Sequence, residues 1–434
     1  MSRNPKFFQD SLPFVSDLVQ NSANAQIVSA HFQAKQAETA ESQQTRQISI
    51  FEIDHAAFLV CDAGMCKNAA SFRCQPTQRT NIRECMMNNT FARILGSLGL
   101  AALPAAAMAA EHQLTALGTF SNQLQSSEIE RPFFEDLPEK FDGRLAVEFR
   151  TSDEVGLSGF DAMRMLKLGI FDVMAIQLGY VSGDEPFVLG LDLPGIAPDL
   201  ELSRKVVDAW RDTFSTRLAE KYDATVLALW PFPGQVFFCK GELTGLSDLK
   251  GKKVRSFTPA MAQLIEYFGG TPVTMSFSEV YPGLQRGVAD CGITATLSGN
   301  TAKWFEVTDT IYPLSIGWGI QAHVVNNAFL DELSEADQTL LIESMKQLED
   351  DMWALAVDSF ADGVNCNTGQ GTCTRGTPAQ MKLTQIQEED LEALRTATLE
   401  VVLPSWAESC DAVWPECSAT WNEVVGPVVG MQVE

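Results

Sequence analysis

The feature that most limits how this chain can fold is a repeated alternation of strand patterns with amphipathic helix patterns. EHQLTALGTF (111–120) predicts a first strand, and residues 125–140 predict a helix. The alternating segment RLAVEFR (144–150) predicts the next strand. GFDAMRMLKLGIFDVMAI (159–176) then passes from a helix through Gly169 into another strand. This alternation indicates an α/β fold with mostly parallel strand pairing.

The same alternation returns in the second half of the chain. The expected elements are a loop and strand at 248–257, a helix at 259–270, a short strand at 271–277, a helix at 278–287 with Ser278 as its N-cap, and a strand at 288–296. A long helical region follows residue 326, and no low-complexity linker divides the two halves. We therefore expect two α/β lobes between which the chain crosses more than once. A ligand would bind in the cleft between them, at strand ends and loops.

The first strongly apolar run, ILGSLGLAALPAAAMAA (94–110), has the form of a secretory signal. Arg93 precedes it, and Ala107-Met108-Ala109 fits the small-residue pattern that signal peptidase cleaves. A membrane span is the alternative, but the run is slightly short and is interrupted by proline, glycine and serine. We expect a signal peptide at 86–110, an upstream segment without a folded role at 1–85, and a protein exported to the periplasm.

Six cysteines follow the predicted signal peptide. They form three candidate pairs: Cys239 with Cys291, Cys366 with Cys373, and Cys410 with Cys417. The last two pairs suit local disulfide loops, and the first needs strands that bring its members together. Export to an oxidising compartment favours disulfides. Zinc is the alternative, but this part has no Cys-x-x-Cys and His112 and His323 stand alone, so no metal site is expected.

Charge and motifs favour binding over catalysis. The net charge of −25 repels nucleic acid and anionic lipid, so neither is an expected partner. After the signal region there is no G-x-S-x-G elbow, H-E-x-x-H helix, P-loop or G-x-G-x-x-G turn. A carboxylate pair stays open, because 56 acidic residues make chance spacings common. We expect no enzyme activity and no cofactor.

The segment LSDLKGKKVRSFTPAMAQLIEYFGGTPVTMSFSEVYPGLQRGVADCGI (246–293) resembles the substrate-binding proteins of tripartite ATP-independent periplasmic (TRAP) transporters, the DctP-like dicarboxylate-receptor family. Those proteins typically carry D-L-K-G-x-K-[IV]-R, a helix, G-x-x-P-[VT], and F-[SG]-E-[VL]-Y-x-[AG]-L-Q-x-G-[VA]-[VA]-D. The matching positions here are Asp248 to Arg255, Gly270, Pro272, Phe277 to Tyr281, Leu284-Gln285, Gly287 and Asp290. AMRMLKLGIFDV (162–173) resembles the helix–Gly–strand unit of the first lobe, and the similarity spans residues 112–360.

The resemblance implies two lobes that close over an organic anion, with a long helix in the hinge region. Arg255 ends the first motif and is the implied carboxylate anchor, since its planar fork of donors matches two carboxylate oxygens. Most of the rest is scaffold, and Glu279 suits the positive end of its helix dipole. The strand after Asp290 would bring Thr294 and Thr296 to the cleft.

The chain departs from the family pattern in two places. Val236 stands where many carboxylate-binding members have a second arginine, and residues 291–294 replace a Gln-Glu-Asn set, so sialic acid is not an expected ligand. The residues expected at the cleft are partly aromatic: Tyr180, Trp230, Phe257 and Trp318, with Asn122, Gln177, Asn300 and Trp304 as secondary candidates for the rim. They suggest a monocarboxylate with an apolar or aromatic body. A Cys239–Cys291 bridge beside the aligned ligand positions would stiffen this wall.

The expected organisation is lobe 1 at 111–235, lobe 2 at 236–320, and a hinge helix, a return to lobe 1 and C-terminal helices at 321–434. The expected function is a periplasmic receptor that captures an organic carboxylate and delivers it to the membrane permease subunits of a TRAP transporter. The alternatives are a receptor for a sensor or another transporter class, and an exported enzyme on the same scaffold.

Overall fold

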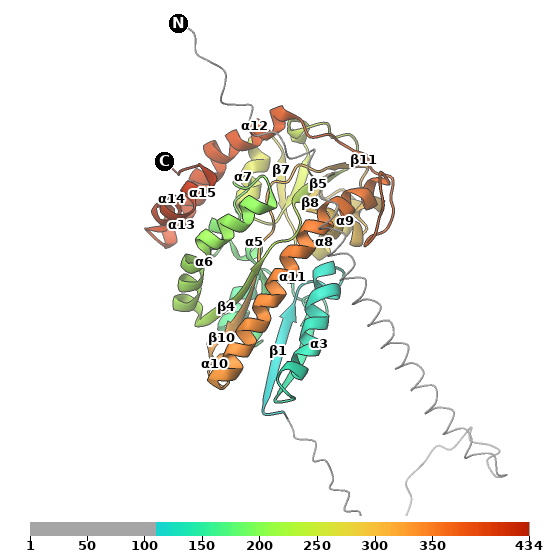
Figure 1. Cartoon of the computed structure of the whole chain (residues 1–434). Helices are drawn as coiled ribbons and strands as arrows, with labels where there is room; N and C mark the ends of the chain where they lie inside the picture. Colours follow the sequence, from blue (N-terminus) through green and yellow to red (C-terminus); the bar gives the residue numbers. More distant parts are fainter. Residues whose placement is uncertain (1–109, 434) are drawn as a thin grey trace, which may run out of the picture. The chain divides into compact units, whose positions relative to one another are not determined.

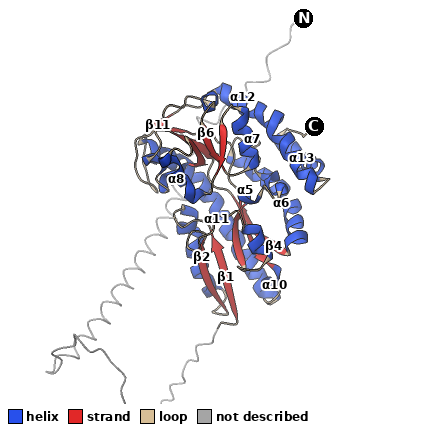
Figure 2. Cartoon of the chain, turned by 180° about the vertical axis from the view of Figure 1, so that it is seen from behind, coloured by secondary structure: helices blue, strands red, loops and turns tan. Residues whose placement is uncertain are grey.

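The computed structural model describes residues 110–433, which fold into two α/β lobes, each with one mixed β-sheet (Figures 1 and 2). The segment 1–85 and nearly all of the predicted signal peptide lie outside the described residues. Within the described range, the structure has no helix with the length and hydropathy needed to cross a membrane.

The first lobe is built on a five-stranded sheet in the order β2-β1-β3-β10-β4. Its strands are β1 (His112–Gly118), β2 (Leu145–Thr151), β3 (Val173–Gln177), β4 (Ala224–Trp230) and β10 (Gln321–Asn326). β1 pairs in parallel with β2 and β3, whereas β10 is antiparallel to β3 and β4. Helices α3 (Arg131–Lys140) and α4 (Ala162–Lys167) lie in the connections between the parallel strands, as the alternation predicted.

The second lobe has a six-stranded sheet in the order β11-β9-β5-β8-β6-β7. Its strands are β5 (Gln235–Cys239), β6 (Lys253–Ser256), β7 (Thr271–Thr274), β8 (Cys291–Ala295), β9 (Thr310–Tyr312) and β11 (Lys382–Leu383). β6 pairs in parallel with β7 and β8 through α7 (Pro259–Tyr267) and α8 (Phe277–Arg286). β5 is antiparallel to β8 and β9. Parallel pairing therefore holds within the βαβ units, whereas β5 and β10, which follow crossings between the lobes, run in the opposite direction.

Two crossing segments, 231–234 and 313–320, connect the lobes and pair with each other at the hinge. Gln235 donates its N–H to Gly317 O (2.8 Å) and accepts from Ile316 N (3.0 Å). The Asp192 carboxylate, in the first lobe, accepts from the backbone N–H of Trp318 (2.8 Å) and of Ile320 (3.2 Å). Burial raises the pKa of Asp192 to about 6, although these N–H groups act in the opposite direction. Asp192 thus fastens the second crossing to the first lobe.

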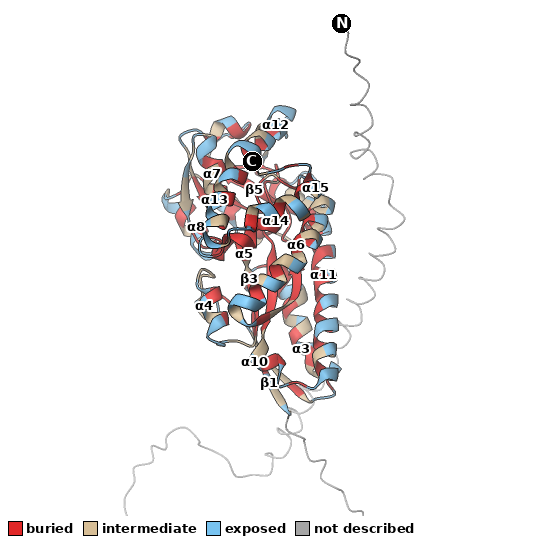
Figure 3. Ribbon diagram, turned by 90° about the vertical axis from the view of Figure 1, so that its left-hand side faces the viewer, coloured by how far each residue is buried: buried red, intermediate tan, exposed pale blue. Residues whose placement is uncertain are grey.

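The helix α11 (Glu335–Thr368) is the expected long helix that joins the lobes. Its 34 residues span about 50 Å. It begins after the cap Ser334, whose Oγ accepts from Asp337 N (3.1 Å), and ends before Gly369, which has φ +68°. It contacts β4 of the first sheet and α9 (Thr296–Thr301) of the second lobe (Figure 1). Buried and exposed residues alternate along it, because one side packs on both lobes (Figure 3).

Helix α8 differs from its prediction in its first residue. The N-cap is Ser276, not Ser278. The Glu279 carboxylate accepts from the backbone N–H of Ser276 (2.9 Å), as in a capping box. Phe277, the first helical residue, is buried against the rings of Phe120 and Trp304. This aromatic packing sets the N-cap two residues earlier than local sequence suggested.

The remaining helices cover both lobes. They are η1 (Gln125–Glu130), α5 (Leu178–Val181), η2 (Pro186–Leu191), α6 (Leu200–Tyr222), η3 (Leu246–Leu249), η4 (Trp304–Glu306), α10 (Asn327–Leu330), α12 (Glu388–Ala397), η5 (Thr398–Val402), α13 (Leu403–Val413), α14 (Cys417–Val424) and α15 (Gly426–Val429). α13 contacts η2 in the first lobe and α7 in the second, and α14 and α15 contact α6. Since β11 also joins the second sheet, residues 321–434 contribute to both lobes.

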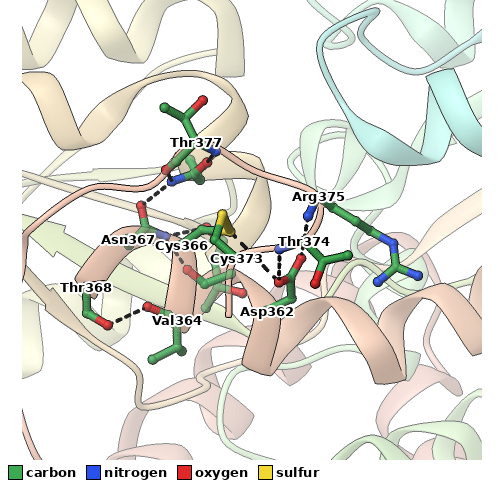
Figure 4. Close-up of a disulfide and its surroundings, with 12 residues drawn as sticks. Asp362, Val364, Cys366, Asn367, Thr368, Cys373, Thr374, Arg375 and Thr377 are labelled. Atoms are coloured by element: carbon green, nitrogen blue, oxygen red, sulfur yellow. Dashed lines mark hydrogen bonds between the residues drawn. A yellow bond between two sulfur atoms is a disulfide. The ribbon is translucent and has the colours of Figure 1, made fainter. Parts of the chain in front are cut away.

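The three expected cysteine pairs are confirmed as disulfides: Cys239–Cys291, Cys366–Cys373 and Cys410–Cys417. Cys239 and Cys291 lie directly opposite each other on β5 and β8. Cys366–Cys373 closes the loop after α11, where Asp362 accepts from the backbone N–H of Thr374 (2.7 Å) and Arg375 (2.9 Å) (Figure 4).

Candidate ligand-binding site

A pocket lies where the two lobes meet. Its lining comes from both lobes and from the first crossing: Leu117, Thr119, Phe120, Gln123, Ser152, Leu157, Gly159, Asp161, Ala162, Met165, Met174, Ala175, Gln177, Tyr180, Phe232, Gln235, Arg255, Phe257, Phe277, Thr294, Ser298 and Gln321. Of the residues that the sequence placed at the cleft, the structure brings together Arg255, Phe257, Thr294, Tyr180 and Gln177.

Arg255 lies on β6, and only 1% of it is exposed. Its Nε donates to Met275 O (3.1 Å), its Nη1 to Ile293 O (2.6 Å) and its Nη2 to the Tyr180 hydroxyl (3.3 Å). All three acceptors are neutral, and within the described range Arg255 forms no ion pair with a carboxylate. Burial lowers the pKa of Arg255, and Tyr180 and the more distant Glu279 offset this only in part. The pocket therefore contains a buried cation without an anionic partner.

Tyr180 reaches this cation from the first lobe. It lies on α5, directly after β3, and Gln177 caps that short helix by accepting from Tyr180 N (3.1 Å). The Tyr180 hydroxyl also accepts from the backbone N–H of Phe277 (2.9 Å) in the second lobe. Burial raises the pKa of Tyr180, so it is a neutral phenol here. The two lobes are thus hydrogen-bonded to each other at the candidate anchor.

Aromatic rings form much of the rest of the wall. The Arg255 guanidinium lies over the Phe257 ring, 4.7 Å from its centroid. Tyr180 meets Phe257 edge to face at 5.8 Å, and Phe120 meets Phe277 at 5.7 Å, so each pair joins one lobe to the other. Such a wall favours a ligand whose body buries apolar surface.

Four glutamines add neutral polar groups: Gln123, Gln177, Gln235 and Gln321. Gln177 and Gln321 are opposite partners on β3 and β10, so their side chains leave the same face of the sheet. Gln235 Nε2 donates to Pro233 O (3.0 Å). In contrast, the side-chain oxygens of Gln123 and Gln321 are buried without a hydrogen-bond partner.

Sequence reasoning missed three of these glutamines. One signal was present for Gln321, because it and His323 are polar positions within the otherwise apolar run IQAHVV (320–325). Such residues in a buried strand need partners, and a pocket is one source of them. Gln123 stands in a polar turn and carries no comparable local signal.

Trp230 and Trp318 lie outside the lining of this pocket. Trp230 is fully buried, and its Nε1 donates to His323 Nδ1 (2.9 Å). Trp318 Nε1 donates to Ala197 O (3.0 Å). Both indoles therefore pack the first lobe and the hinge, where their N–H groups have backbone or side-chain acceptors.

The remaining predicted residues also lie outside the lining. Thr296 Oγ1 donates to Phe360 O (3.0 Å) on α11. The Asn300 side chain donates to Asn367 Oδ1 and Thr377 O and accepts from Thr377 N, so it joins α9 to the loop after α11. Trp304 is fully buried against Phe238 and Phe277. Asn122 is exposed, in a separate surface depression with Tyr281 and Lys303.

His323, which has no companion metal ligand in the sequence, lies next to two polar side chains in the structure. Its Nε2 lies 3.3 Å from Glu130 Oε1, and neither side chain is exposed. Because Nδ1 accepts from Trp230, Nε2 is the nitrogen that carries the proton towards Glu130 when the ring is neutral. The other oxygen of Glu130 accepts from the N–H and hydroxyl of Thr119 (2.9 and 2.7 Å), which lines the pocket. A buried polar cluster therefore lies directly behind the first-lobe wall.

The described residues contain no group of three or more His, Cys, Asp or Glu side chains placed to hold a metal ion. All six cysteines of this part are in disulfides.

Comparison with known proteins identifies the family that shares this architecture. Residues 119–409 match the family of bacterial extracellular solute-binding proteins, family 7 (DctP). The chain is 27% identical over 186 residues to the ectoine-binding periplasmic protein TeaA of Halomonas elongata, covering 42% of this chain and 54% of TeaA. It is 26% identical over 286 residues to the C4-dicarboxylate-binding periplasmic protein DctP of Rhodobacter capsulatus, covering 63% of this chain and 85% of that protein. The alignment with TeaA thus spans only about half of that protein, whereas the one with DctP spans most of it.

Solved structures share the fold. A TRAP periplasmic solute-binding protein of Desulfovibrio salexigens with bound orotic acid superimposes with a TM-score of 0.65 at 15% identity, covering 73% of this chain and 99% of that one. DctP6 of Bordetella pertussis, an extracytoplasmic solute receptor that binds pyroglutamic acid, gives a TM-score of 0.63 at 20% identity, covering 72% and 99%. These likenesses confirm the two-lobe α/β fold expected from the sequence.

The family match confirms the resemblance found in the 246–293 motif, and with it the expected class of function. TRAP solute-binding proteins bind small organic solutes and work with membrane permease components, and the family consists of receptors rather than enzymes. The chain belongs to the DctP family of bacterial extracellular solute-binding proteins and is a receptor of the TRAP-transporter type.

Proposed function

We propose that this receptor binds an organic monocarboxylate in the pocket between its lobes, with Arg255 as the carboxylate anchor, and delivers it unchanged to a TRAP permease. We further propose that the protein works in the periplasm after removal of a signal peptide at 86–110. Three disulfides within the described residues support an oxidising compartment.

The unpaired charge of Arg255 is the observation that carries this proposal. A buried guanidinium is costly unless an anion compensates for it, and carbonyl oxygens alone supply only part of that compensation. Arg255 already uses Nε, Nη1 and Nη2 once each, and a guanidinium has five donor hydrogens. A ligand carboxylate can therefore accept from the remaining hydrogens and complete the ion pair.

The rest of the wall supports a body that is apolar or aromatic. Arg255 is the one cation in the described lining of the pocket, so a single carboxylate finds a partner there. Phe120, Phe257 and Phe277 are placed to pack on a ring or a short hydrocarbon body. Solved relatives were found with orotic acid and pyroglutamic acid, which carry one carboxyl group on a ring, and with succinate, which is a dicarboxylate.

The test is calorimetric titration of the purified protein with a panel of aliphatic and cyclic monocarboxylates, dicarboxylates and sugar acids. We expect a monocarboxylate to bind and Arg255→Ala to weaken it at least about 100-fold, because bonds to a charged donor and the ion pair are lost together. Arg255→Lys keeps the charge without the fork and should bind with intermediate affinity. Arg150→Ala is the control, because Arg150 is exposed and pairs with Glu148.

Three results would count against the proposal. Binding that persists in Arg255→Ala would move the carboxylate site elsewhere. A response only to uncharged or cationic compounds would exclude an acid as ligand. Conversion of the bound compound during prolonged incubation would favour an enzyme over a receptor.

A further inference from the structure

The pocket has a second set of polar side chains on the wall that the first lobe forms, whereas Arg255 lies on the wall of the second lobe. Gln123 precedes η1, and Gln321 is the first residue of β10. They are 6% and 2% exposed, and both line the pocket. The side-chain oxygen of each has no hydrogen-bond partner in the described structure. Leaving such an atom buried and unpaired is unfavourable, so both oxygens need a donor.

Unpaired polar atoms are concentrated on this side of the first lobe. Of the ten buried side-chain atoms without a partner within the described residues, five are on the turn and helix around η1 or on β10. Three of them, on Ser126, Glu130 and His323, belong to residues outside the pocket lining, and Glu130 Oε1 and His323 Nε2 lie 3.3 Å from each other. Of the five residues, only Gln123 and Gln321 belong to the pocket lining. The two amides therefore differ from ordinary core residues, because each combines an unpaired acceptor oxygen with a place in the pocket lining.

The charged side chains of the pocket lining indicate which chemical group of a ligand the two amides recognise. Apart from Arg255, the charged side chain among the described lining residues is Asp161, which is largely exposed and 3.7 Å from Arg164. A second carboxylate would therefore meet neutral amides and one carboxylate of like charge. A hydroxyl or a ring N–H, in contrast, can donate to an amide oxygen without charge desolvation.

We propose that Gln123 and Gln321 form a subsite for a neutral hydrogen-bond donor of the ligand, so that the receptor selects cyclic monocarboxylates bearing a hydroxyl or lactam N–H over dicarboxylates. This subsite deepens the proposed function and rests on Arg255 as the carboxylate anchor. The anchor supplies charge recognition from one lobe, and the amide pair supplies selection from the other.

The test compares acids that share a ring and differ in one group. Benzoate, 3-hydroxybenzoate, 4-hydroxybenzoate, isophthalate and terephthalate form one series, and cyclopentanecarboxylate with pyroglutamate forms another. In at least one series the donor-bearing acid should bind at least about tenfold more tightly than the unsubstituted acid, because it satisfies a buried acceptor. The diacids should bind no better than benzoate.

The variants Gln321→Met and Gln123→Met remove the acceptors with little change in volume. Each should reduce the preference for the donor-bearing acid about fivefold to tenfold while the unsubstituted acid binds as before. Gln347→Met, an exposed position on α11, is the control and should leave the preference unchanged. Thermal unfolding of each ligand-free variant checks that it is folded, and the two single variants test the subsite independently.

Two outcomes would overturn this subsite while leaving the anchor intact: a diacid that binds more tightly than every donor-bearing monoacid, and a preference that survives in both glutamine variants. Arg255-dependent binding in which the donor group makes no difference would also overturn it. If none of these acids binds, or if binding is independent of Arg255, the proposed function fails and the subsite fails with it.

Discussion

The Tyr180 hydroxyl lies 3.3 Å from Arg255 Nη2 and accepts a hydrogen bond from it across the boundary between the lobes. The two residues are 75 positions apart in the sequence and belong to different lobes, Tyr180 to α5 directly after β3 of the first sheet and Arg255 to β6 of the second. The same hydroxyl accepts from Phe277 N (2.9 Å). One neutral group of the first lobe thus holds both the candidate anchor and the start of α8 in the second lobe.

Replacing Tyr180 with Phe should therefore weaken ligand binding without removing the anchor. The change leaves the Arg255 and Phe277 donors without this acceptor, which should cost about tenfold in affinity. Calorimetric titration with the acid identified for the wild type measures the effect. Tyr267→Phe is the matched control, because the Tyr267 hydroxyl bonds the exposed Glu400. Equal affinity of Tyr180→Phe and wild type would show that this bond does not contribute to binding.

The disulfides should contribute unequally to stability. Cys239–Cys291 links residues 52 positions apart, whereas Cys410–Cys417 links residues 7 apart, and all four side chains are fully buried. The loop-closure entropy model predicts that removing the first bridge lowers the free energy of unfolding by about 4 kcal/mol and that removing the second lowers it by about 2 kcal/mol. Urea denaturation of the two double-alanine variants measures both losses. Each variant leaves the same kind of cavity at a buried cysteine pair, so the comparison reports the difference between the loops. A larger loss for the short loop would contradict the entropic account.

Asp192 should make stability depend on pH in a direction opposite to that of most paired carboxylates. Its folded pKa of about 6 lies above its ordinary value of 3.8. The folded state therefore binds the proton more tightly, and stability from this group falls as the pH rises from about 4 to about 6, by up to about 3 kcal/mol. Asp192→Asn should remove that fall.

Urea denaturation of wild type and Asp192→Asn at pH 4 and pH 7 isolates this contribution as the difference between their two pH dependences. The exposed Asp136→Asn serves as the control. If wild type and Asp192→Asn show the same change in free energy of unfolding between pH 4 and pH 7, then the Asp192 carboxylate at the hinge does not titrate as described.

Gly363 should be necessary for the packing of α11 on the second lobe. A Cβ at this position would lie 2.3 Å from Thr296 Oγ1 and 2.6 Å from the backbone nitrogen of Leu297, so either α11 or α9 must shift. Gly363→Ala should lower the free energy of unfolding by about 1–3 kcal/mol, as overpacking typically does. Gly183→Ala is the control, because nothing lies within 4 Å of a Cβ there. Urea denaturation compares the two, and an unchanged midpoint for Gly363→Ala would show that the contact relaxes freely.

Local pattern was sufficient to predict the helices and strands and to name Arg255 as a candidate anchor, but not to predict where each element begins and ends. The βαβ units of both lobes were predicted because apolar periodicity and glycine turns are properties of short segments. Ser278 was chosen as the N-cap on local grounds, yet α8 begins after Ser276, because the packing of Phe277 against Phe120 of the other lobe is invisible in the local sequence. The antiparallel direction of β5 and β10 likewise depends on where the chain crosses between the lobes.

The sequence by itself determined the α/β class, the two lobes, the family and the identity of Arg255 as a candidate anchor, because these depend on periodicity and on a long contiguous motif. Only the tertiary structure decided which other side chains surround that anchor. In the structure, Trp230 is hydrogen-bonded to His323, Asn300 is hydrogen-bonded to the loop after α11, and Gln123 and Gln321 line the pocket. The physical reason is that a pocket is formed by residues far apart in the chain, and the orientation of each side chain is set by packing with partners that no local pattern specifies.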